Sequence, residues 1–129
     1  EMSWKNTFSR LDDMYMENLS PKEKMRNFVE ILYDEIISRK GLGGELFKEN
    51  VLTEENSKEL IFMKEELSKR IQSLLQELRS STEVRLSEAM DDRIASTVFM
   101  LIIEMLKQFP SERERNLEFI NQLVESIYM

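Results

Sequence analysis

The side chains of this sequence that could do chemistry are carboxylates, and several of them stand in adjacent pairs. Two facing carboxylates could act as general acid and base or hold a hard cation. Each pair, however, adjoins the polar side of a helical stripe, where carboxylates are solvated, and the spacing of a calcium-binding loop does not occur. We therefore expect neither a catalytic nor a metal site among them. The pairs are Asp12–Asp13, Asp34–Glu35, Glu54–Glu55, Glu65–Glu66 and Asp91–Asp92.

Histidine and cysteine are both absent from the chain, which removes much of the usual catalytic and metal-binding chemistry. No imidazole can serve as a general base, no Ser–His–Asp triad can form, and the Glu-x-x-His motif of di-iron bundles is missing. Zinc prefers Cys and His ligands. The sequence thus predicts a protein that is not an enzyme, with no catalytic residue, no cofactor and no bound metal. The alternative, an acidic bundle enzyme, would need a pocket with buried, facing carboxylates.

The segment Gly41-Leu42-Gly43-Gly44 holds all three glycines of the chain, with Lys48 nearby. A glycine-rich turn before a helix can present backbone N–H groups to a phosphate. No strand is predicted before this turn and no Gly-Lys-Ser/Thr follows it, so the phosphate-loop pattern is absent. We interpret Gly41 as the end of a helix and expect a short helix over residues 45–50.

The composition favours a single domain, residues 1–129, built from helices. The 129 residues are 41% hydrophobic and 33% charged, with three Gly and two Pro, which is too apolar for disorder and too poor in turn residues for a many-stranded fold. The net charge of −7 makes nucleic acid an unexpected partner. No apolar signal segment opens the sequence. We therefore expect an intracellular protein, cytoplasmic or nuclear, and not a secreted one.

The most apolar stretch, Ile94–Leu106, is expected to lie at the centre of the fold. Ten of its thirteen residues are apolar, and this run is too short to cross a bilayer, for which about 20 residues are needed. Apolar positions at helical spacing extend back to Val84. We therefore predict one long core helix over about residues 83–108, wrapped by other elements. In the division of the chain into elements this helix is assigned residues 82–108. The predicted fold is an all-α, compact bundle of about five long helices plus one short helix, with no membrane span.

Four further helices are expected from apolar stripes and start signals. The clearest start is Ser20-Pro21, because serine can cap a helix, proline suits its first position, and Glu23 completes a capping box with Ser20. Other start signals are Thr53, the Ser80–Glu83 box and the Ser111–Glu114 box. The predicted helices span residues 2–18, 21–40, 53–79 and 111–128.

The N-terminal helix carries the candidate partner-binding residues. Its apolar side chains recur at helical spacing, and tryptophan and tyrosine are frequent anchors in interfaces. The chain also holds nine methionines, which are flexible and over-used on surfaces that accept varied partners. Two interpretations stay open: the stripe packs on the core, or it forms an apolar groove for a partner's helix. The candidates are Trp4, Phe8, Leu11, Met14, Tyr15 and Met16.

Recognition is the function class that these exclusions leave. We expect a non-enzymatic adaptor or regulatory module that binds a partner protein through an apolar groove or a helical face. The partner could present an amphipathic helix. It could also be a second copy in a homodimer, because about three heptads of apolar positions in residues 53–79 permit a coiled-coil seam.

One short segment, Gly44-Glu45-Leu46-Phe47-Lys48 followed by Leu52-Thr53-Glu54, resembles part of the helical-repeat middle domain of the large translation-initiation scaffold. The resemblance implies an alternative function as a helical-repeat-like fragment of an RNA- or translation-associated scaffold. That function would require basic side chains to converge on one surface. These are Lys22, Lys24, Arg26, Arg39, Lys40 and Lys48. The architecture also resembles apoptosis-regulator-like bundles, which implies binding of an amphipathic partner helix.

Overall fold

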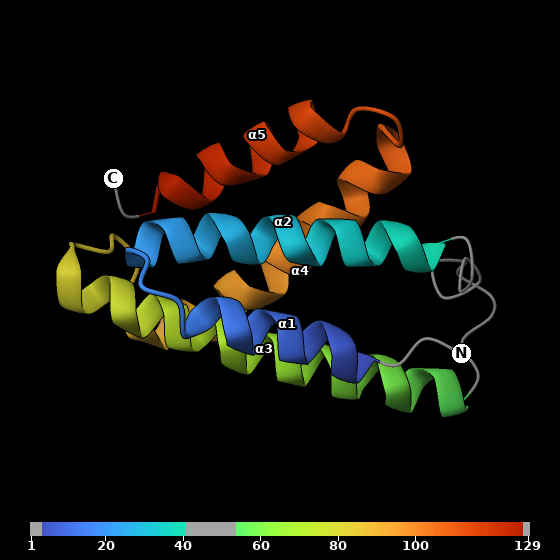
Figure 1. The fold of residues 1–129 in the computed structure, drawn as a ribbon, viewed down its shortest axis with the longest axis horizontal. Coiled ribbons are helices and arrows are strands. Elements are labelled where there is room, and N and C mark those ends of the chain that lie inside the picture. Colours follow the sequence, from blue (N-terminus) through green and yellow to red (C-terminus); the bar gives the residue numbers. More distant parts are fainter. Residues whose placement is uncertain (1–3, 41–53, 128–129) are drawn as a thin grey trace.

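The structure, a computed structural model, describes residues 4–40 and 54–127. Within these ranges the chain forms five α-helices, one short 3-10 helix and no strand, which confirms the predicted all-α bundle (Figure 1). The elements are α1 (Trp4–Tyr15), α2 (Pro21–Lys40), α3 (Glu54–Ser81), η2 (Glu88–Met90), α4 (Asp91–Gln108) and α5 (Arg113–Glu125). The predicted short helix over 45–50 and the roles assigned to Gly41 and Thr53 lie outside the described residues.

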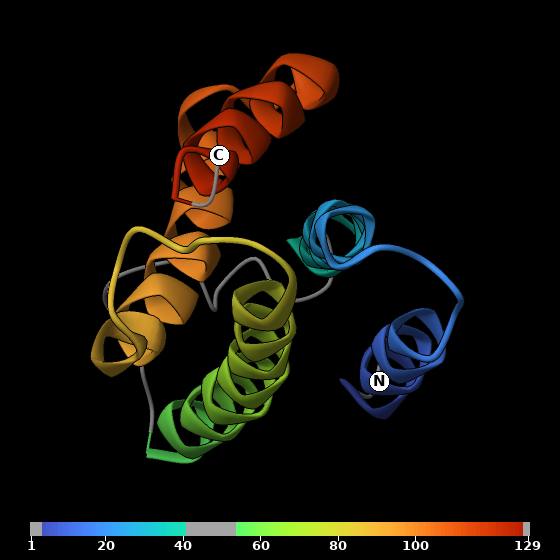
Figure 2. The same ribbon diagram turned by 90° about the vertical axis from the view of Figure 1, so that its left-hand side faces the viewer.

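Each α-helix runs roughly opposite to the one before it, so the chain passes back and forth along the long axis of the molecule (Figure 1). Seen from the end, α1 and α2 lie on one side, α3 lies below, and α4 and α5 form the opposite side (Figure 2). Helix α2 is the hub of this arrangement, because it contacts every other α-helix.

The start of α2 confirms the predicted capping box. The Glu23 backbone N–H donates to the Ser20 hydroxyl, and the Ser20 backbone N–H donates to the Glu23 carboxylate, both at 3.2 Å. These reciprocal bonds satisfy two donors that a helix start otherwise leaves open. The hub helix is thus set in place by a signal that needs only residues three positions apart.

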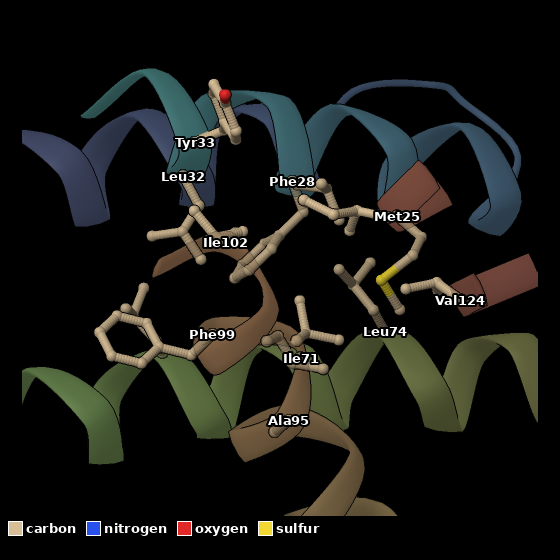
Figure 3. Packing of buried hydrophobic residues seen from close by; sticks show 14 of the residues in the cluster. Met25, Phe28, Leu32, Tyr33, Ile71, Leu74, Ala95, Phe99, Ile102 and Val124 are labelled. Carbon is tan, nitrogen blue, oxygen red and sulfur yellow. The ribbon is translucent and has the colours of Figure 1, made fainter. Parts of the chain in front are cut away.

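The core fills the space between α2, α3, α4 and α5, with α1 covering it from the side. Figure 3 shows Phe28 and Leu32 of α2 meeting Ile71 of α3 and Ile102 of α4. Each of these side chains is at most 1% exposed. A core packed from four helices at once makes each large-to-small substitution costly, because the cavity left behind cannot collapse fully.

The predicted start of the core helix is wrong. Helix α3 continues to Ser81, so Ser80 and Glu83 form no capping box, and α4 begins only at Asp91. Tertiary contacts hold the intervening backbone in place of helical ones: the Arg85 N–H donates to the carbonyl of Ile127 at 2.7 Å. The carbonyl of Leu86 accepts from a guanidinium of α3 at 2.7 Å.

The last helix also starts later than predicted. It begins at Arg113, and the residue before it, Glu112, makes no side-chain cap bond. Because Glu112 and not Ser111 is the residue before the helix, the expected box of Ser111 with Glu114 does not form. The carboxylate of Glu114 accepts from Arg113 at 2.6 Å instead.

Helix α4 is buried on one side rather than wrapped all round. Its inner face carries the core residues, while Ser96 and Thr97 are exposed and Met100 is 50% exposed. The helix packs against α3, α5 and α2, and these neighbours leave its outer face uncovered. The edge of α4 that carries Thr97 and Leu101 adjoins the end of α5, and the surface described next follows this edge.

Candidate docking surface on α4 and α5

The predicted partner-binding residues of α1 lie mainly inside the bundle. Phe8, Leu11 and Met14 are 8%, 1% and 4% exposed and belong to the hydrophobic core. Tyr15 is half-buried against that core. Of the two interpretations of this helix, the structure favours packing on the core.

The two remaining candidates of that stripe do not make a surface either. Met16 is 80% exposed just beyond the end of α1, and the side chain of Trp4 lies outside the described residues. A single exposed methionine is ordinary on a protein surface and forms no groove. We therefore place no docking surface on the described part of α1.

Ion pairs fasten α1 to the rest of the bundle. The buried carboxylate of Glu35 accepts from the Thr7 hydroxyl at 3.1 Å and from Arg10 at 3.0 Å. Arg70 of α3 donates twice to Asp12, at 2.9 and 3.2 Å. Burial lowers the pKa of Arg70, but its hydrogen bonds to Asp12 and to a second carboxylate outweigh burial and raise it. The charged form of Arg70 is therefore part of the folded structure.

A second cluster joins α2 to α3. The Lys24 ammonium donates to the Glu77 carboxylate at 3.0 Å and lies 4.8 Å from the centre of the Tyr15 ring. The hydrogen bond from Lys24 lowers the pKa of Glu77. Burial, followed by the contact with Glu77, raises the pKa of the Tyr15 phenol.

Arginine side chains join α5 to α2. The guanidinium of Arg113 donates to both oxygens of Asp34, at 2.9 and 2.8 Å, and to Glu30 at 2.9 Å. These hydrogen bonds, the one to Asp34 first, raise the pKa of Arg113 above its usual value. At the other end of the same seam, Arg26 pairs with Glu125. A bidentate pair of this kind sets helix orientation as well as contributing energy.

Two buried polar contacts complete the inner framework. The side-chain amide of Asn116 donates to the Tyr33 hydroxyl at 2.8 Å and to the carbonyl of Phe109 at 2.9 Å. Arg79 at the end of α3 pairs with Asp91, the first residue of α4, whose side chain is 4% exposed. The buried amide of Asn116 and the buried carboxylate of Asp91 each have hydrogen-bonding partners, which compensates for their loss of hydration.

The outer side of α4 and α5 has the opposite character, because large apolar side chains lie there in solvent. Five of them are 40–46% exposed: Leu86, Met90, Phe109, Phe119 and Leu123. Three half-buried neighbours, Leu101, Met105 and Ile127, pack against the core and complete the surface. We call these eight residues the α4–α5 face. On α4 they are spaced at i, i+4, and on α5 likewise, so they follow one side of each helix.

The α4–α5 face is hollowed at both ends. A groove of about 370 Å³ lies where the linker before α4 meets the end of α5, and it also takes in Arg93 and Thr97. Its apolar lining includes Leu86, Met90, Ile94, Leu101, Leu123 and Ile127. A second hollow of about 330 Å³ lies at the turn between the helices, lined by Met105, Phe109, Glu112, Arg115, Asn116 and Phe119. We call the first the groove end and the second the aromatic end.

Ion pairs do not bridge α4 to α5 within residues 54–127, although they cross the seams α1–α2, α1–α3, α2–α3, α2–α5 and α3–α4. The α4–α5 seam is held by apolar contacts instead. Exposed apolar surface that is contiguous and rimmed by polar residues is typical of interaction sites. The α4–α5 face is therefore our candidate functional site.

The sequence contained a signal for this surface that was not used. Helix 111–128 carries apolar residues at 117, 119, 120, 123, 124 and 127, which is wider than one buried stripe requires. The structure buries Leu117, Ile120 and Val124 and leaves Phe119 and Leu123 outside. An over-wide stripe indicates a second contact face, but it does not tell which residues belong to it.

The two alternative functions, an RNA-associated scaffold and an acidic bundle enzyme, depend on charged side chains, several of which form ion pairs within the bundle. Lys24 and Arg26, two of the basic residues that an RNA-binding surface would need, pair with Glu77 and Glu125. The side chains of Arg39, Lys40 and Lys48 lie outside the described residues. The buried carboxylates Glu35 and Asp91 each bind an arginine and do not share a pocket.

Comparison of the chain with models of protein families, with curated protein sequences and with solved structures finds no match. In the part of the chain that the structure describes, no helix combines the length and apolar character that a bilayer crossing requires. Within the same residues, no group of three or more acidic side chains is arranged to hold a metal ion.

Proposed function

We propose that this protein is a non-enzymatic interaction module that associates with protein through its α4–α5 face. The observation that carries the proposal is the exposure of large apolar side chains along α5 and at the two ends of α4, including two aromatic rings, Phe109 and Phe119. Aromatic side chains and methionine are enriched in the buried centres of protein interfaces. Where other helices of this bundle meet, charged side chains lie at the surface. At the α4–α5 face large apolar side chains lie there instead, and burying them against a partner would be favourable.

The charge distribution supports an interaction role over a catalytic one. The buried acidic groups, Glu35 and Asp91, are each bound by an arginine, so their carboxylate oxygens already have partners. The α4–α5 face itself is lined mainly by apolar atoms, with Arg93, Glu112 and Arg115 at its edges. Such a lining binds by excluding water and contains no pair of groups that could move a proton.

Photo-crosslinking from single positions tests the proposal. A photo-reactive phenylalanine analogue at Phe119 or Leu123 should yield discrete protein adducts in cells that express the protein. The same analogue at Met16 serves as the control and should yield no adduct. Met16 is more exposed than Phe119 or Leu123, but it follows α1 and does not belong to the α4–α5 face.

A further change sharpens that test. Adding Leu123→Glu, an exposed position one helical turn from Phe119, should abolish the adducts at Phe119, since a charge on the face opposes its desolvation. The proposal is overturned if Phe119 and Met16 give equal labelling, or if neither position gives an adduct.

A further inference from the structure

We propose that the occupant of the α4–α5 face is a second copy of this chain, related by a two-fold axis. The proposal rests on the interaction function proposed above and identifies the partner for that same surface. Three properties of the face support it: its area, its two unlike ends and the charges at its rim.

The area fits the dimer interface of a small protein. Aromatic side chains bury about 150–250 Å² each and leucine or methionine somewhat less, so the eight residues at their observed exposure offer roughly 500 Å² of apolar surface. A standard interface buries about 800 Å² per partner, of which about 56–65% is apolar. The face therefore supplies the apolar part of one standard interface.

The two ends of the face differ in chemistry. The aromatic end is a hollow of about 330 Å³ whose wall includes the rings of Phe109 and Phe119, both 46% exposed. The groove end is a hollow of about 370 Å³ lined by Leu86, Met90 and Leu123 among others. In a two-fold pairing, residue i of one protomer contacts residue j of the other and the reverse. Such a pairing places each aromatic end against the partner copy's groove end and buries both at once.

The rim charges permit this pairing despite the net charge of −7. Arg93 at the groove end lies 3.3 Å from Asp92, and both side chains are more than 60% exposed. Arg115 at the aromatic end lies 3.3 Å from Glu112. Each end thus holds both signs, so a second copy meets no uniform field of its own sign, and the arginine of one end can face the carboxylate of the other.

Sedimentation equilibrium of the full chain from about 1 to 200 μM tests the inference. We expect a mass of twice the 15.4 kDa chain, and a dissociation constant raised at least about 100-fold by Phe119→Glu or Leu123→Glu, because both place a charge in a desolvated centre. Met16→Glu is the control and should leave the constant within about twofold. Circular dichroism of each variant shows that its helices are intact.

Introduced cysteines then test the geometry, and the natural chain contains none that would interfere. Phe119→Cys protein mixed with Met90→Cys protein should form a mixed disulfide dimer faster than either forms a dimer with itself. A mixture of Met16→Cys with Met90→Cys protein should form none. Preferential self-pairing of the Phe119→Cys protein would contradict the proposed end-to-end exchange.

The outcomes separate this inference from the proposed function. A wild-type monomer up to 200 μM overturns the second copy as occupant, and so does a dimer that Phe119→Glu and Leu123→Glu leave intact. If the chain is monomeric but photo-crosslinks at Phe119 to a different protein, the interaction function stands and only its partner is reassigned. If the chain is monomeric and gives no adducts at Phe119, both proposals fail.

Discussion

The seams around α2 and the seam between α4 and α5 are built in different ways. The contacts of α2 with α1, α3 and α5 each include a carboxylate bound by a lysine or arginine, such as Glu35 with Arg10 and Asp34 with Arg113. Between α4 and α5, the described residues make apolar contacts and leave Phe119 and Leu123 partly in water. Ion pairs suit a surface that stays in solvent, because their outer atoms remain hydrated. Exposed apolar side chains are stabilised when another surface covers them, which is the role that we propose for the α4–α5 face.

The largest expected effect is on the free energy of unfolding, and it distinguishes an apolar residue of the core from one of the α4–α5 face. Phe28→Ala should lower the free energy of unfolding by about 3–5 kcal/mol, because it removes a fully buried ring and leaves a cavity. Phe119→Ala should change it by less than about 0.5 kcal/mol in the monomer. Urea unfolding measures both substitutions in a Leu123→Glu background, in which a second copy does not cover the face. Equal losses would mean that Phe119 belongs to the monomer core.

The next effect compares a buried ion pair with an exposed one. Arg79→Met leaves the carboxylate of Asp91 buried without its partner, and it should cost about 2–4 kcal/mol. Arg93→Met is the matched control, because it breaks the exposed pair with Asp92 and should cost less than about 0.5 kcal/mol.

A double variant checks the cause of that loss. Adding Asp91→Leu to Arg79→Met should restore most of the stability, because no buried charge then remains uncompensated. Thermal unfolding measures the stability of each of these variants, with one heat-capacity change of unfolding used for all of them. If the double variant were less stable than Arg79→Met alone, the carboxylate would have a role other than its pairing.

A smaller effect concerns the polar tie between α2 and α5. Tyr33→Phe removes the hydroxyl that accepts from Asn116, and it should cost about 1–2 kcal/mol, because the amide loses one of its two buried partners. Chemical denaturation measures the loss. Amide hydrogen exchange should become faster in α5 than in α1, and uniform acceleration in both helices would argue against a local tie.

The smallest effect depends on pH. Because the folded-state pKa of Glu77 is lowered by Lys24, the stability that this pair contributes is present above the unfolded pKa of about 4.3 and is lost as the pH falls through the folded value. Glu77→Gln should therefore cost about 0.2–1 kcal/mol at pH 7, and this cost should shrink as the pH falls through the folded value. Unfolding curves of both proteins from pH 3 to 8 check this. A difference that grows toward acid pH would reverse the sign and exclude the pair as its cause.

Sequence signals that depend on nearby residues were predictive, and those that depend on the rest of the chain were not. The Ser20–Glu23 capping box formed as expected, since it needs only residues within one helical turn. The start of α4 was placed too early, because the backbone of Arg85 bonds to Ile127, which lies 42 positions further along the chain. Apolar spacing alone could not reveal that contact.

The candidate site shows the same limit. The sequence indicated that α1 carries an apolar stripe and that residues 111–128 carry a wide one, but both could have been core or surface. The structure buried Phe8 and Leu11 under α2 and α3 and left Phe119 and Leu123 uncovered. Which stripe is covered depends on how many helices surround it, and that number is a property of the assembled bundle.

The amino-acid sequence by itself determined that this protein is helical, where α2 begins, and that histidine and cysteine chemistry are absent, because these follow from residue types and spacings of three or four positions. Only the tertiary structure decided that α2 is the hub, that the linker before α4 is not α-helical, and that the exposed apolar surface lies along α5 and at the two ends of α4. The physical reason is that burial and ion pairing join residues distant in the chain, and their partners are defined only once the helices have packed.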